Sequence, residues 1–426
     1  MRATGDTAGR PGGAGRGRPV RQLHHDTADR PFIVIWEVTR ACALACRHCR
    51  ADAIPRRNPR ELDTEQGKRL LDGLASFGAP RPLVVLTGGD PFERPDLAEL
   101  VAYGTSVGLS VALSPSVTPR LTPGVLAGLR DAGAKAVSIS LDGAEAATHD
   151  AFRGVPGVFD DTLVALDAVR AAGLRLQVNT TVTAGNVHEL PRVLRRVLDA
   201  GVSLWSVFFL VPTGRGQALD ALSAQDEEEV LHWLHEVSDL VAVKATEAAH
   251  HRRVAVQRAA ARQAAARRGA EQCAAERPDA ERRATGPGGF DDLDVAFPPG
   301  PLRERLRRET VAALAGGTFA RRPPRPPMDV GSGRGFAFVD HVGDVYPSGF
   351  LPVVAGSVRD ASFPDVYRTS PVLTALRDPD ALGGRCGRCE FRSVCGGSRS
   401  QAYARTGDLL AEDPSCAWVP AEGVLA

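Results

Sequence analysis

The chain has 426 residues, 43% of them hydrophobic, and a formal net charge of +1 at pH 7. This length suffices for one large domain and a smaller one, and the even charge balance excludes a basic footprint for nucleic acid. No apolar run approaches membrane-spanning length, which excludes a membrane segment. Residues 1–30 are rich in Gly, Arg and Pro and lack the apolar core of a secretory signal, so we expect a disordered tail there.

The cysteines are distributed unevenly. Of the 8 cysteines, all but one fall in two tight groups, at 42–49 and 386–416, and Cys273 stands alone. Clustered cysteines favour metal ligation in a reducing cytosol over a disulfide scaffold. The sequence therefore predicts a cytoplasmic metalloprotein in which Cys273 is a free thiol without a role.

Short apolar segments alternate with amphipathic ones from residue 32 to about residue 246. The expected strands are Phe32–Val38, Leu83–Thr87, Leu109–Leu113, Ala136–Leu141, Leu174–Val182 and Leu204–Val211. The expected helices are Thr64–Ser76, Asp96–Ser106, Thr122–Asp131, Asp160–Ala171 and Val187–Ala200, several of them closed by a glycine at position 108, 133, 173 or 201. Repeated strand–helix units predict parallel strands with right-handed crossovers, hence an open or closed α/β barrel, although a doubly wound sheet has the same pattern.

The first expected strand leads directly into Cys42, Cys46 and Cys49. Structural zinc takes four protein ligands and an ordinary iron–sulfur cubane takes four thiolates, whereas this group offers three. His48 adjoins Cys49, so both side chains can hardly reach one small metal centre. Three thiolates suit a cluster with one metal left open for chemistry, and a zinc site or three buried thiols are the alternatives.

The second expected strand ends in Gly88, Gly89, Asp90 and Pro91. In a barrel of parallel strands, ligands bind at that carboxyl end. A glycine pair after a strand by itself indicates only a tight turn. Its position on the strand that follows the three cysteines makes it a candidate part of the same site.

Polar residues also end the later strands. Ser140 and Asp142 close the fourth expected strand, and Arg153 follows on a helix, where its planar guanidinium suits a bidentate carboxylate or a helix-surface ion pair. On the fifth strand, Gln177 and Asn179 share one face. Buried amides need partners, which either a bound nucleoside or an internal hydrogen-bond network provides.

Between residues 255 and 330 the composition changes to Ala, Arg, Glu and Pro. This favours an Arg/Ala helix with a flexible proline-rich joint, and a substrate-covering arm is the alternative. His250 and His251, just before this stretch, are interpreted as a solvated strand end, with a substrate contact or haem ligation as the alternative. After Gly331 the pattern becomes β-like, which predicts a second, smaller domain.

That second region carries Cys386, Cys389, Cys395 and Cys416, separated by two, five and twenty residues. Four thiolates in this order bind either zinc or an iron–sulfur cluster, because a sequence does not distinguish these metals.

In these motifs the chain resembles the radical S-adenosylmethionine (radical SAM) enzymes, of the maturase type with a C-terminal auxiliary iron–sulfur domain called SPASM or twitch. The resemblance covers residues 31–254 and 331–420. It implies an α/β fold, with a partial (β/α)6 TIM-like barrel over residues 31–254. A linker or insertion over 255–330 and a SPASM/twitch-like domain over 331–426 complete the expected organisation.

The resemblance also implies cofactors. The first three cysteines are expected to hold a 4Fe-4S cluster whose open iron binds S-adenosylmethionine (SAM), and reductive cleavage then gives a 5'-deoxyadenosyl radical that abstracts hydrogen from substrate. The residues implied in SAM binding are His48, Gly88, Gly89, Asp90, Pro91, Ser140, Arg153 and Asn179. The family usually has Glu where this chain has Asp90, but the contact is chiefly main-chain. No catalytic residue is assigned beyond these ligands.

A full SPASM domain has seven cysteines for two clusters, but here Ser348 and Arg399 stand where two of them fall. The resemblance therefore implies one auxiliary 4Fe-4S cluster, held by all four C-terminal cysteines. It extends to proteins of haem d1 and alternative haem synthesis and to peptide maturases. The implied partners are a tetrapyrrole or small peptide substrate and a flavodoxin- or ferredoxin-type reductant, without nucleic acid or membrane. An iron–sulfur electron carrier and a zinc-binding module are the alternatives.

Overall fold

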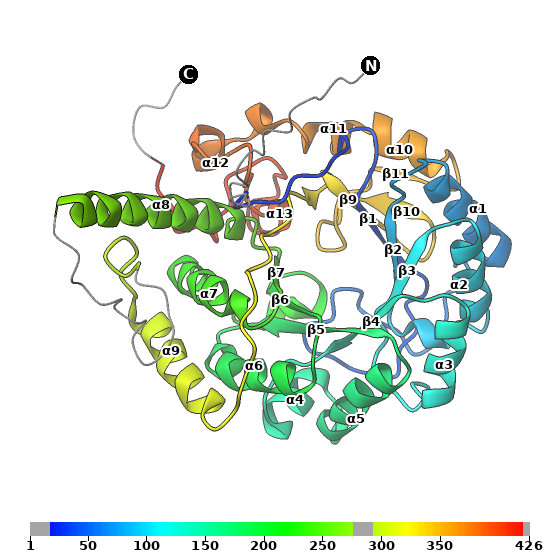
Figure 1. Cartoon of the computed structure of the whole chain (residues 1–426). Helices are drawn as coiled ribbons and strands as arrows, with labels where there is room; N and C mark the ends of the chain where they lie inside the picture. The colour runs from blue at the N-terminus through cyan, green and yellow to red at the C-terminus, as the bar shows by residue number, and fades with distance from the viewer. Residues whose placement is uncertain (1–17, 276–292, 421–426) are drawn as a thin grey trace, which may run out of the picture.

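The computed structural model of the chain describes residues 18–275 and 293–420, with the side chains of 269–275 excepted. One curved sheet organises these residues, with the strands in the order β11-β10-β9-β1-β2-β3-β4-β5-β6-β7 and β8 paired to β9 (Figure 1). The strands are β1 (Ile33–Glu37), β2 (Leu83–Thr87), β3 (Ser110–Leu113), β4 (Ala136–Ser140), β5 (Arg175–Val182), β6 (Leu204–Phe209), β7 (Val243–Thr246), β8 (Gly331–Ser332), β9 (Gly335–Val339), β10 (Asp344–Tyr346) and β11 (Gly356–Ser357).

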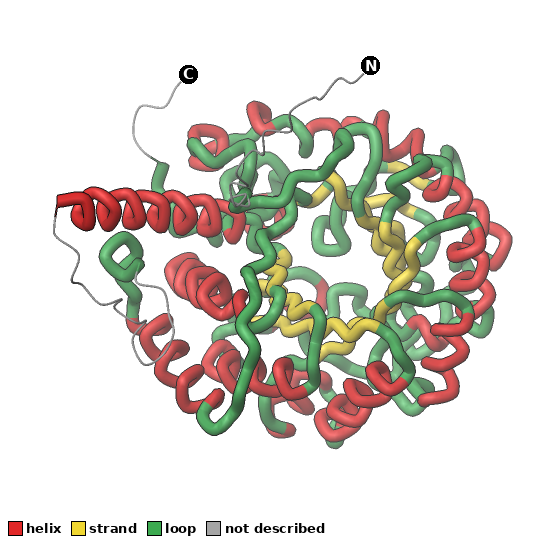
Figure 2. Tube along the Cα trace, in the orientation of Figure 1, coloured by secondary structure: helices red, strands yellow, loops and turns green. Residues whose placement is uncertain are grey.

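Helices surround the strands on the outside of the curve (Figure 2). They are α1 (Thr64–Ala75), α2 (Leu97–Ser106), α3 (Pro123–Asp131), α4 (Ala146–Arg153), α5 (Val158–Ala171), α6 (Leu190–Asp199), α7 (Ala224–Glu236), α8 (His251–Ala275), α9 (Pro301–Leu314), α10 (Phe363–Thr369), α11 (Pro371–Ala375), α12 (Gly384–Arg388) and α13 (Arg399–Thr406). None of the helices in the described ranges combines the length and apolar character that a bilayer span requires.

The strand–helix alternation expected from the sequence is confirmed. Strands β1 to β7 pair parallel in chain order. Helix α1 shows why the sequence predicted the helices. Asp63 and Gln66 form a capping box at its start, and Leu70 and Leu74 are buried against the sheet. Glycines also follow the helices as expected, for example Gly133 with φ +102.

The β-like C-terminal segment extends the same sheet. Strand β9 pairs parallel with β1, in the register Ile33 to Phe336, and β10 returns antiparallel to β9. Strand β1 therefore has a hydrogen-bonded neighbour on both edges, one from each half of the chain. The segments around α12 and α13, which carry the C-terminal cysteines, come after these strands in the chain.

Two other regions have described contacts. Within the tail expected over residues 1–30, residues 1–17 lie outside the described residues, whereas 18–30 run against the C-terminal half. There Tyr367 Oη donates to the Thr27 carbonyl at 2.6 Å. The Arg/Ala-rich stretch forms α8, which extends away from the barrel (Figure 1). The side chain of Cys273, on the distal part of α8, lies outside the described residues.

Candidate active site

The sheet has two different faces, and β5 shows the difference. Val178 and Thr180 are fully buried under the helices, whereas Gln177 and Asn179 point inward and stay partly accessible. Gln177 Nε2 donates to Asn179 Oδ1 at 2.7 Å, so the amides do form an internal hydrogen bond. Asn179 pairs in register with Ser140 of β4, which brings these two candidate SAM residues side by side.

The three N-terminal cysteines lie on the loop that leaves β1. The Leu44 amide donates to Cys42 Sγ at 3.3 Å, and Arg153 Nη1 lies 3.7 Å from Cys46 Sγ. Donors directed at sulfur stabilise a thiolate, the form that ligates iron. Apolar side chains of Leu44 and Val158 pack beside the thiols. N–H donors to the sulfurs, together with apolar side chains that exclude water, fit a cluster ligated by thiolates.

Glycines bring neighbouring backbone close to that loop. A Cβ on Gly89 would collide with the carbonyl oxygen of Ala41, and one on Gly154, which has φ +71, would lie 2.6 Å from that of Ala45. The amides of Gly89 and Asp90 donate to Thr39 and Ala41 at 2.8 and 2.7 Å. The glycine turn after β2 is therefore held directly against the cysteine loop, as the shared-site prediction requires.

The Asp90 side chain is fully buried. Its carboxylate accepts from Thr118 Oγ1 at 2.8 Å and from the Phe92 amide at 3.2 Å. Burial raises the pKa of Asp90, and these hydrogen bonds counteract part of that rise. The Asp90 carboxylate therefore forms hydrogen bonds within the turn itself. The rest of the turn consists of Gly88, Gly89 and Pro91.

A buried ion pair lies next to the loop that carries Cys42, Cys46 and Cys49. Arg153 Nη2 is 2.5 Å from Asp142 Oδ2, and both side chains are almost entirely buried. Although burial alone would raise it, the Arg153 guanidinium lowers the pKa of Asp142 below its usual range. Arg153 is therefore not the helix-surface residue that one interpretation gave. Its position against Asp142 and Cys46 leaves its contact with SAM a prediction.

Two histidines flank this pair. Burial lowers the pKa of His48 to about 4, and its ring lies over Phe152 with centroids 4.5 Å apart. His149 Nδ1 accepts from the Asp142 amide at 3.1 Å, and burial lowers its pKa to about 4 as well. Burial thus disfavours the protonated form of both imidazoles beside the Arg153–Asp142 pair.

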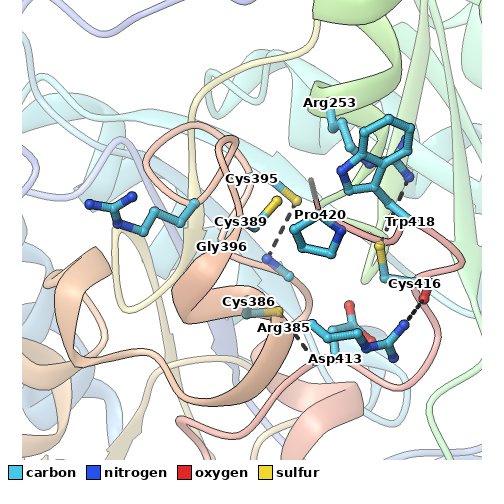
Figure 3. A pocket seen from close by; sticks show the side chains of 12 residues that line it. Arg253, Arg385, Cys386, Cys389, Cys395, Gly396, Asp413, Cys416, Trp418 and Pro420 are labelled. Carbon is cyan, nitrogen blue, oxygen red and sulfur yellow. Dashed lines mark hydrogen bonds between the residues drawn. The ribbon is translucent and has the colours of Figure 1, made fainter. Parts of the chain in front are cut away.

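The four C-terminal cysteines line one cavity that opens to solvent (Figure 3). Each sulfur has an N–H group directed at it, three from the backbone and others from arginine side chains. These contacts are Asp413 N and Arg399 Nη2 to Cys386, Phe391 N to Cys389, Gly397 N to Cys395 and Arg253 Nη2 to Cys416, at 3.3 to 3.9 Å.

Burial raises the pKa of Cys395 to about 11 and that of Cys416 to about 12. These thiols would keep their protons at neutral pH unless a metal displaced them, and metal ligation does so. In the described ranges, no three His, Cys, Asp or Glu side chains are grouped as a single metal ion requires. Four thiols with N–H donors around one cavity supply ligands for either an iron–sulfur cluster or zinc.

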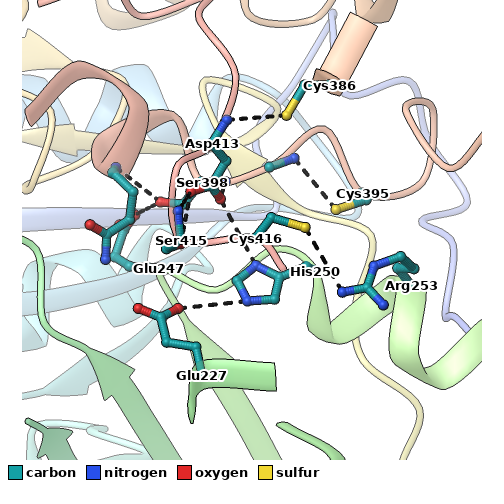
Figure 4. Close-up of polar contacts among 12 residues, drawn as sticks. Glu227, Glu247, His250, Arg253, Cys386, Cys395, Ser398, Asp413, Ser415 and Cys416 are labelled. Atoms are coloured by element: carbon teal, nitrogen blue, oxygen red, sulfur yellow. Dashed lines mark hydrogen bonds and ion pairs between the residues drawn. The ribbon is translucent and has the colours of Figure 1, made fainter. Parts of the chain in front are cut away.

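A buried polar network lies behind this cavity (Figure 4). His250 Nε2 is 3.6 Å from Glu227 Oε2, and its Nδ1 is 3.9 Å from Asp413 Oδ2. His250 is fully buried and His251 is 5% exposed, so their interpretation as a solvated strand end is wrong. The reason lies in tertiary contacts. Helix α7, through Glu227, and the loop around Asp413, which precedes Cys416, cover the start of α8.

The two positions without the family's cysteines have other partners. Ser348 Oγ donates to Glu247 Oε1 at 2.8 Å, and Arg399 Nη2 donates to Cys386 Sγ at 3.5 Å. Next to Arg399, Ser398 Oγ donates to the other Glu247 oxygen, Oε2, at 2.9 Å. Glu247 has φ +60, a left-handed conformation that is unusual for this residue type. Sequence reasoning gave no role to Glu247 or Arg253, because Ser348, Ser398 and Cys416, which contact them, are distant along the chain.

Comparison with known proteins identifies the class. The model of the radical SAM superfamily matches residues 36–202, which run from the end of β1 through β5 and include the three N-terminal cysteines. With the relatives described next, this shows that the chain belongs to the radical SAM superfamily of enzymes, which use a 4Fe-4S cluster and SAM.

Among its relatives, the chain is 37% identical to the AdoMet-dependent heme synthase of Methanosarcina barkeri, over 92% of this chain and 97% of that protein. It is 29% identical to the pre-heme d1 synthase of Dinoroseobacter shibae, over 94% and 91%. It is 31% identical to the mycofactocin maturase of Mycobacterium tuberculosis, over 93% and 86%.

The solved structure of Streptococcus suis SuiB bound to S-adenosylmethionine aligns with a TM-score of 0.58 at 14% identity, over 92% of this chain and 78% of SuiB. This likeness shows a shared fold and confirms the radical SAM barrel that the motifs indicated. It also shows that the similarity extends past the barrel into the cysteine-bearing half of the chain.

Proposed function

We propose that this radical SAM enzyme modifies a side chain of a haem-type tetrapyrrole. The observation that carries the proposal is the 37% identity to a heme synthase over almost the full length of both chains. The similarity spans 92% of this chain and 97% of that relative, so it reaches beyond the barrel proposed over 31–254. The proposed division is a barrel over 31–254, a linker over 255–330 and an auxiliary domain over 331–426.

In the proposed site, Cys42, Cys46 and Cys49 hold the 4Fe-4S cluster, which with SAM supplies a hydrogen-abstracting radical. The glycine turn at Gly88–Pro91 packs directly against the loop that carries these cysteines, because Gly88 and Gly89 have no Cβ to collide with the carbonyls of Thr39 and Ala41. Ser140 and Asn179 offer polar groups on the inner face one strand apart. His48 and Arg153 close the site on the side of the cluster loop.

For the second centre, Cys386, Cys389, Cys395 and Cys416 are proposed to hold one auxiliary 4Fe-4S cluster with full protein ligation. The four thiols and the N–H donors on every sulfur support this assignment over zinc. A closed cluster has no site for SAM, so its proposed role is electron transfer or substrate positioning. The proposed reductant is a flavodoxin- or ferredoxin-type protein.

The test is anaerobic turnover. Reconstituted, reduced protein is incubated with SAM and a propionate-bearing iron porphyrin, and mass spectrometry follows 5'-deoxyadenosine and the porphyrin. We expect both deoxyadenosine and a porphyrin product of changed mass. Deoxyadenosine without any change in the porphyrin would refute the tetrapyrrole assignment, and no deoxyadenosine under any condition would refute SAM chemistry altogether.

A peptide substrate is the second candidate, favoured by the 31% identity to a mycofactocin maturase. The same assay with short peptides encoded beside the enzyme's gene distinguishes the two. A peptide of changed mass together with an unmodified porphyrin would replace the first proposal by the second.

A further inference from the structure

Strand β7 places Lys244 on the inner face of the sheet. Asn179 of β5 pairs with Ser206 of β6, and Ser206 pairs with Lys244. Residues paired in this way across parallel strands point to the same side. Ser206, between the two, is fully buried, and its Oγ lies 3.1 Å from Thr246 Oγ1. Because adjacent strands lie about 4.8 Å apart, the Lys244 backbone lies roughly 10 Å from that of Asn179.

The Lys244 amine has an unusual environment. The surrounding protein lowers its pKa by burial, yet the side chain remains partly accessible. Glu247 is the carboxylate that acts on it electrostatically, but both Glu247 oxygens accept hydrogen bonds from serines. Within residues 18–275 and 293–420, no side chain or carbonyl forms a hydrogen bond or ion pair with Lys244 Nζ.

The other two lysines of the chain have the environments that are usual for lysine, one paired with carboxylates and one exposed. Lys68 lies on α1 and bonds to Glu65 and Glu99 at 2.9 and 2.7 Å. Lys135 is exposed to solvent. A lysine kept for stability is normally exposed or paired, because removing an ammonium group from water without a partner costs free energy. An enclosed, unpaired Lys244 therefore fits a site for an anion that arrives with a ligand.

The surroundings of Lys244 indicate which anion. Phe208 shares the face of Ser206, and its ring lies 6.2 Å from that of Phe350, with both side chains partly accessible. Aromatic faces pack well against a flat apolar ring system. A cation beside such faces matches a ligand that combines an apolar ring with acidic substituents. A haem-type tetrapyrrole with propionate side chains has this combination.

We propose that Lys244 binds a propionate carboxylate of the tetrapyrrole substrate and so orients the macrocycle on the inner face, beside the SAM site. The inference rests on the proposed function and adds to it the group of the substrate that is recognised. The carboxylate supplies the partner that the amine lacks, in a charge-assisted hydrogen bond of the kind that is strong when shielded from water. Lys244 is a binding residue in this proposal and takes no part in hydrogen abstraction.

The test compares three proteins and two ligands. The wild-type enzyme, Lys244→Met and Lys244→Arg are reconstituted with iron, and haemin or haemin dimethyl ester is titrated by absorbance. Methionine keeps the length of the side chain without its charge, and arginine keeps the charge. We expect Lys244→Met to bind haemin about tenfold or more weakly, Lys244→Arg to recover much of the affinity, and wild type and Lys244→Met to bind the ester equally.

Controls separate this effect from folding and from SAM binding. Iron content and far-ultraviolet circular dichroism of Lys244→Met should match wild type, as should its dissociation constant for SAM. Equal haemin binding by wild type and Lys244→Met would overturn the proposal, as would an equal loss for haemin and its ester or a loss confined to SAM. Failure of wild type to bind any porphyrin would instead overturn the proposed function, and this inference with it.

Discussion

Arg399 Nη2 lies 3.5 Å from Cys386 Sγ and donates a hydrogen bond to it. Arg399 stands at a position where a two-cluster SPASM domain would place a cysteine. The same guanidinium is fixed by the carbonyl of Ala411, at 2.6 Å from Nη1. Arg399, which replaces a cysteine, thus supplies a charged hydrogen-bond donor to Cys386, a proposed ligand of the auxiliary cluster.

We predict that Arg399→Gln lowers the reduction potential of the auxiliary cluster. Removing a positive donor from a ligating sulfur disfavours the more negative reduced state, by about 60 mV for each tenfold change in a one-electron equilibrium. Redox titration followed by electron paramagnetic resonance measures the shift. Arg405→Gln, at an exposed position of the same helix, is the matched control, and an equal potential in both variants would contradict the prediction.

The two cysteine groups should separate SAM cleavage from the complete reaction. We expect Cys46→Ala to abolish 5'-deoxyadenosine formation while keeping the auxiliary iron. Cys386→Ala should lose about half of the iron and still cleave SAM, because its cluster is the closed one. Cys273→Ala is the cysteine control and should behave as wild type. Zinc in the wild-type protein that is absent from Cys386→Ala, with equal iron in both, would show instead that the C-terminal site is a zinc site.

The buried pair of Arg153 and Asp142 should be costly to break. Asp142→Asn leaves a buried guanidinium without its carboxylate, and we expect a loss of about 3–5 kcal/mol in the free energy of unfolding. Asp199→Asn breaks the exposed pair with Arg195 and should cost less than about 1 kcal/mol. Anaerobic chemical denaturation of both variants measures the difference, and similar losses would show that burial does not distinguish the two pairs.

Stability should fall on mild acidification because of His149. Its pKa is about 4 in the folded protein and 6.5 as an unperturbed histidine, so between these values the unfolded state binds the extra proton. The folded protein is therefore favoured most above pH 6.5 and progressively less towards pH 4. Denaturation midpoints from about pH 7.5 to about pH 5.5 measure the slope.

His149→Gln should make this slope shallower, by at most about 1.4 kcal/mol per pH unit. His24→Gln, at an exposed position, serves as the control and should leave the slope unchanged. An unchanged slope in His149→Gln would mean that this imidazole is solvated in the folded protein.

The barrel strands and the ligand motifs were predictable because their signals are local. An apolar run such as Leu83–Thr87 followed by two glycines defines both a strand and the turn that ends it. The cysteines in each group lie close in sequence, so their spacing alone indicated metal sites. The family and the fold class followed from these short segments and are confirmed.

The parts that sequence did not predict depend on distant partners. The burial of His250 requires Glu227 on α7 and Asp413 near the C-terminus. The pairing of β9 with β1 joins strands about 300 residues apart, and the short run Gly335–Val339 suits a free hairpin equally well. The exposure of a side chain such as Lys244 likewise depends on which face its strand turns inward, which register decides.

The place of β1 between β2 and β9 also sets the order in which the molecule is assembled. During synthesis the ribosome releases β1 among the first segments, whereas β9 emerges after about four fifths of the chain. Until then, one edge of the nascent barrel offers unpaired backbone groups, which invite pairing with a strand of another copy. A shortened chain that stops before β9 would keep that open edge permanently, so the barrel half is expected to aggregate when it is expressed without its cysteine-bearing C-terminal half.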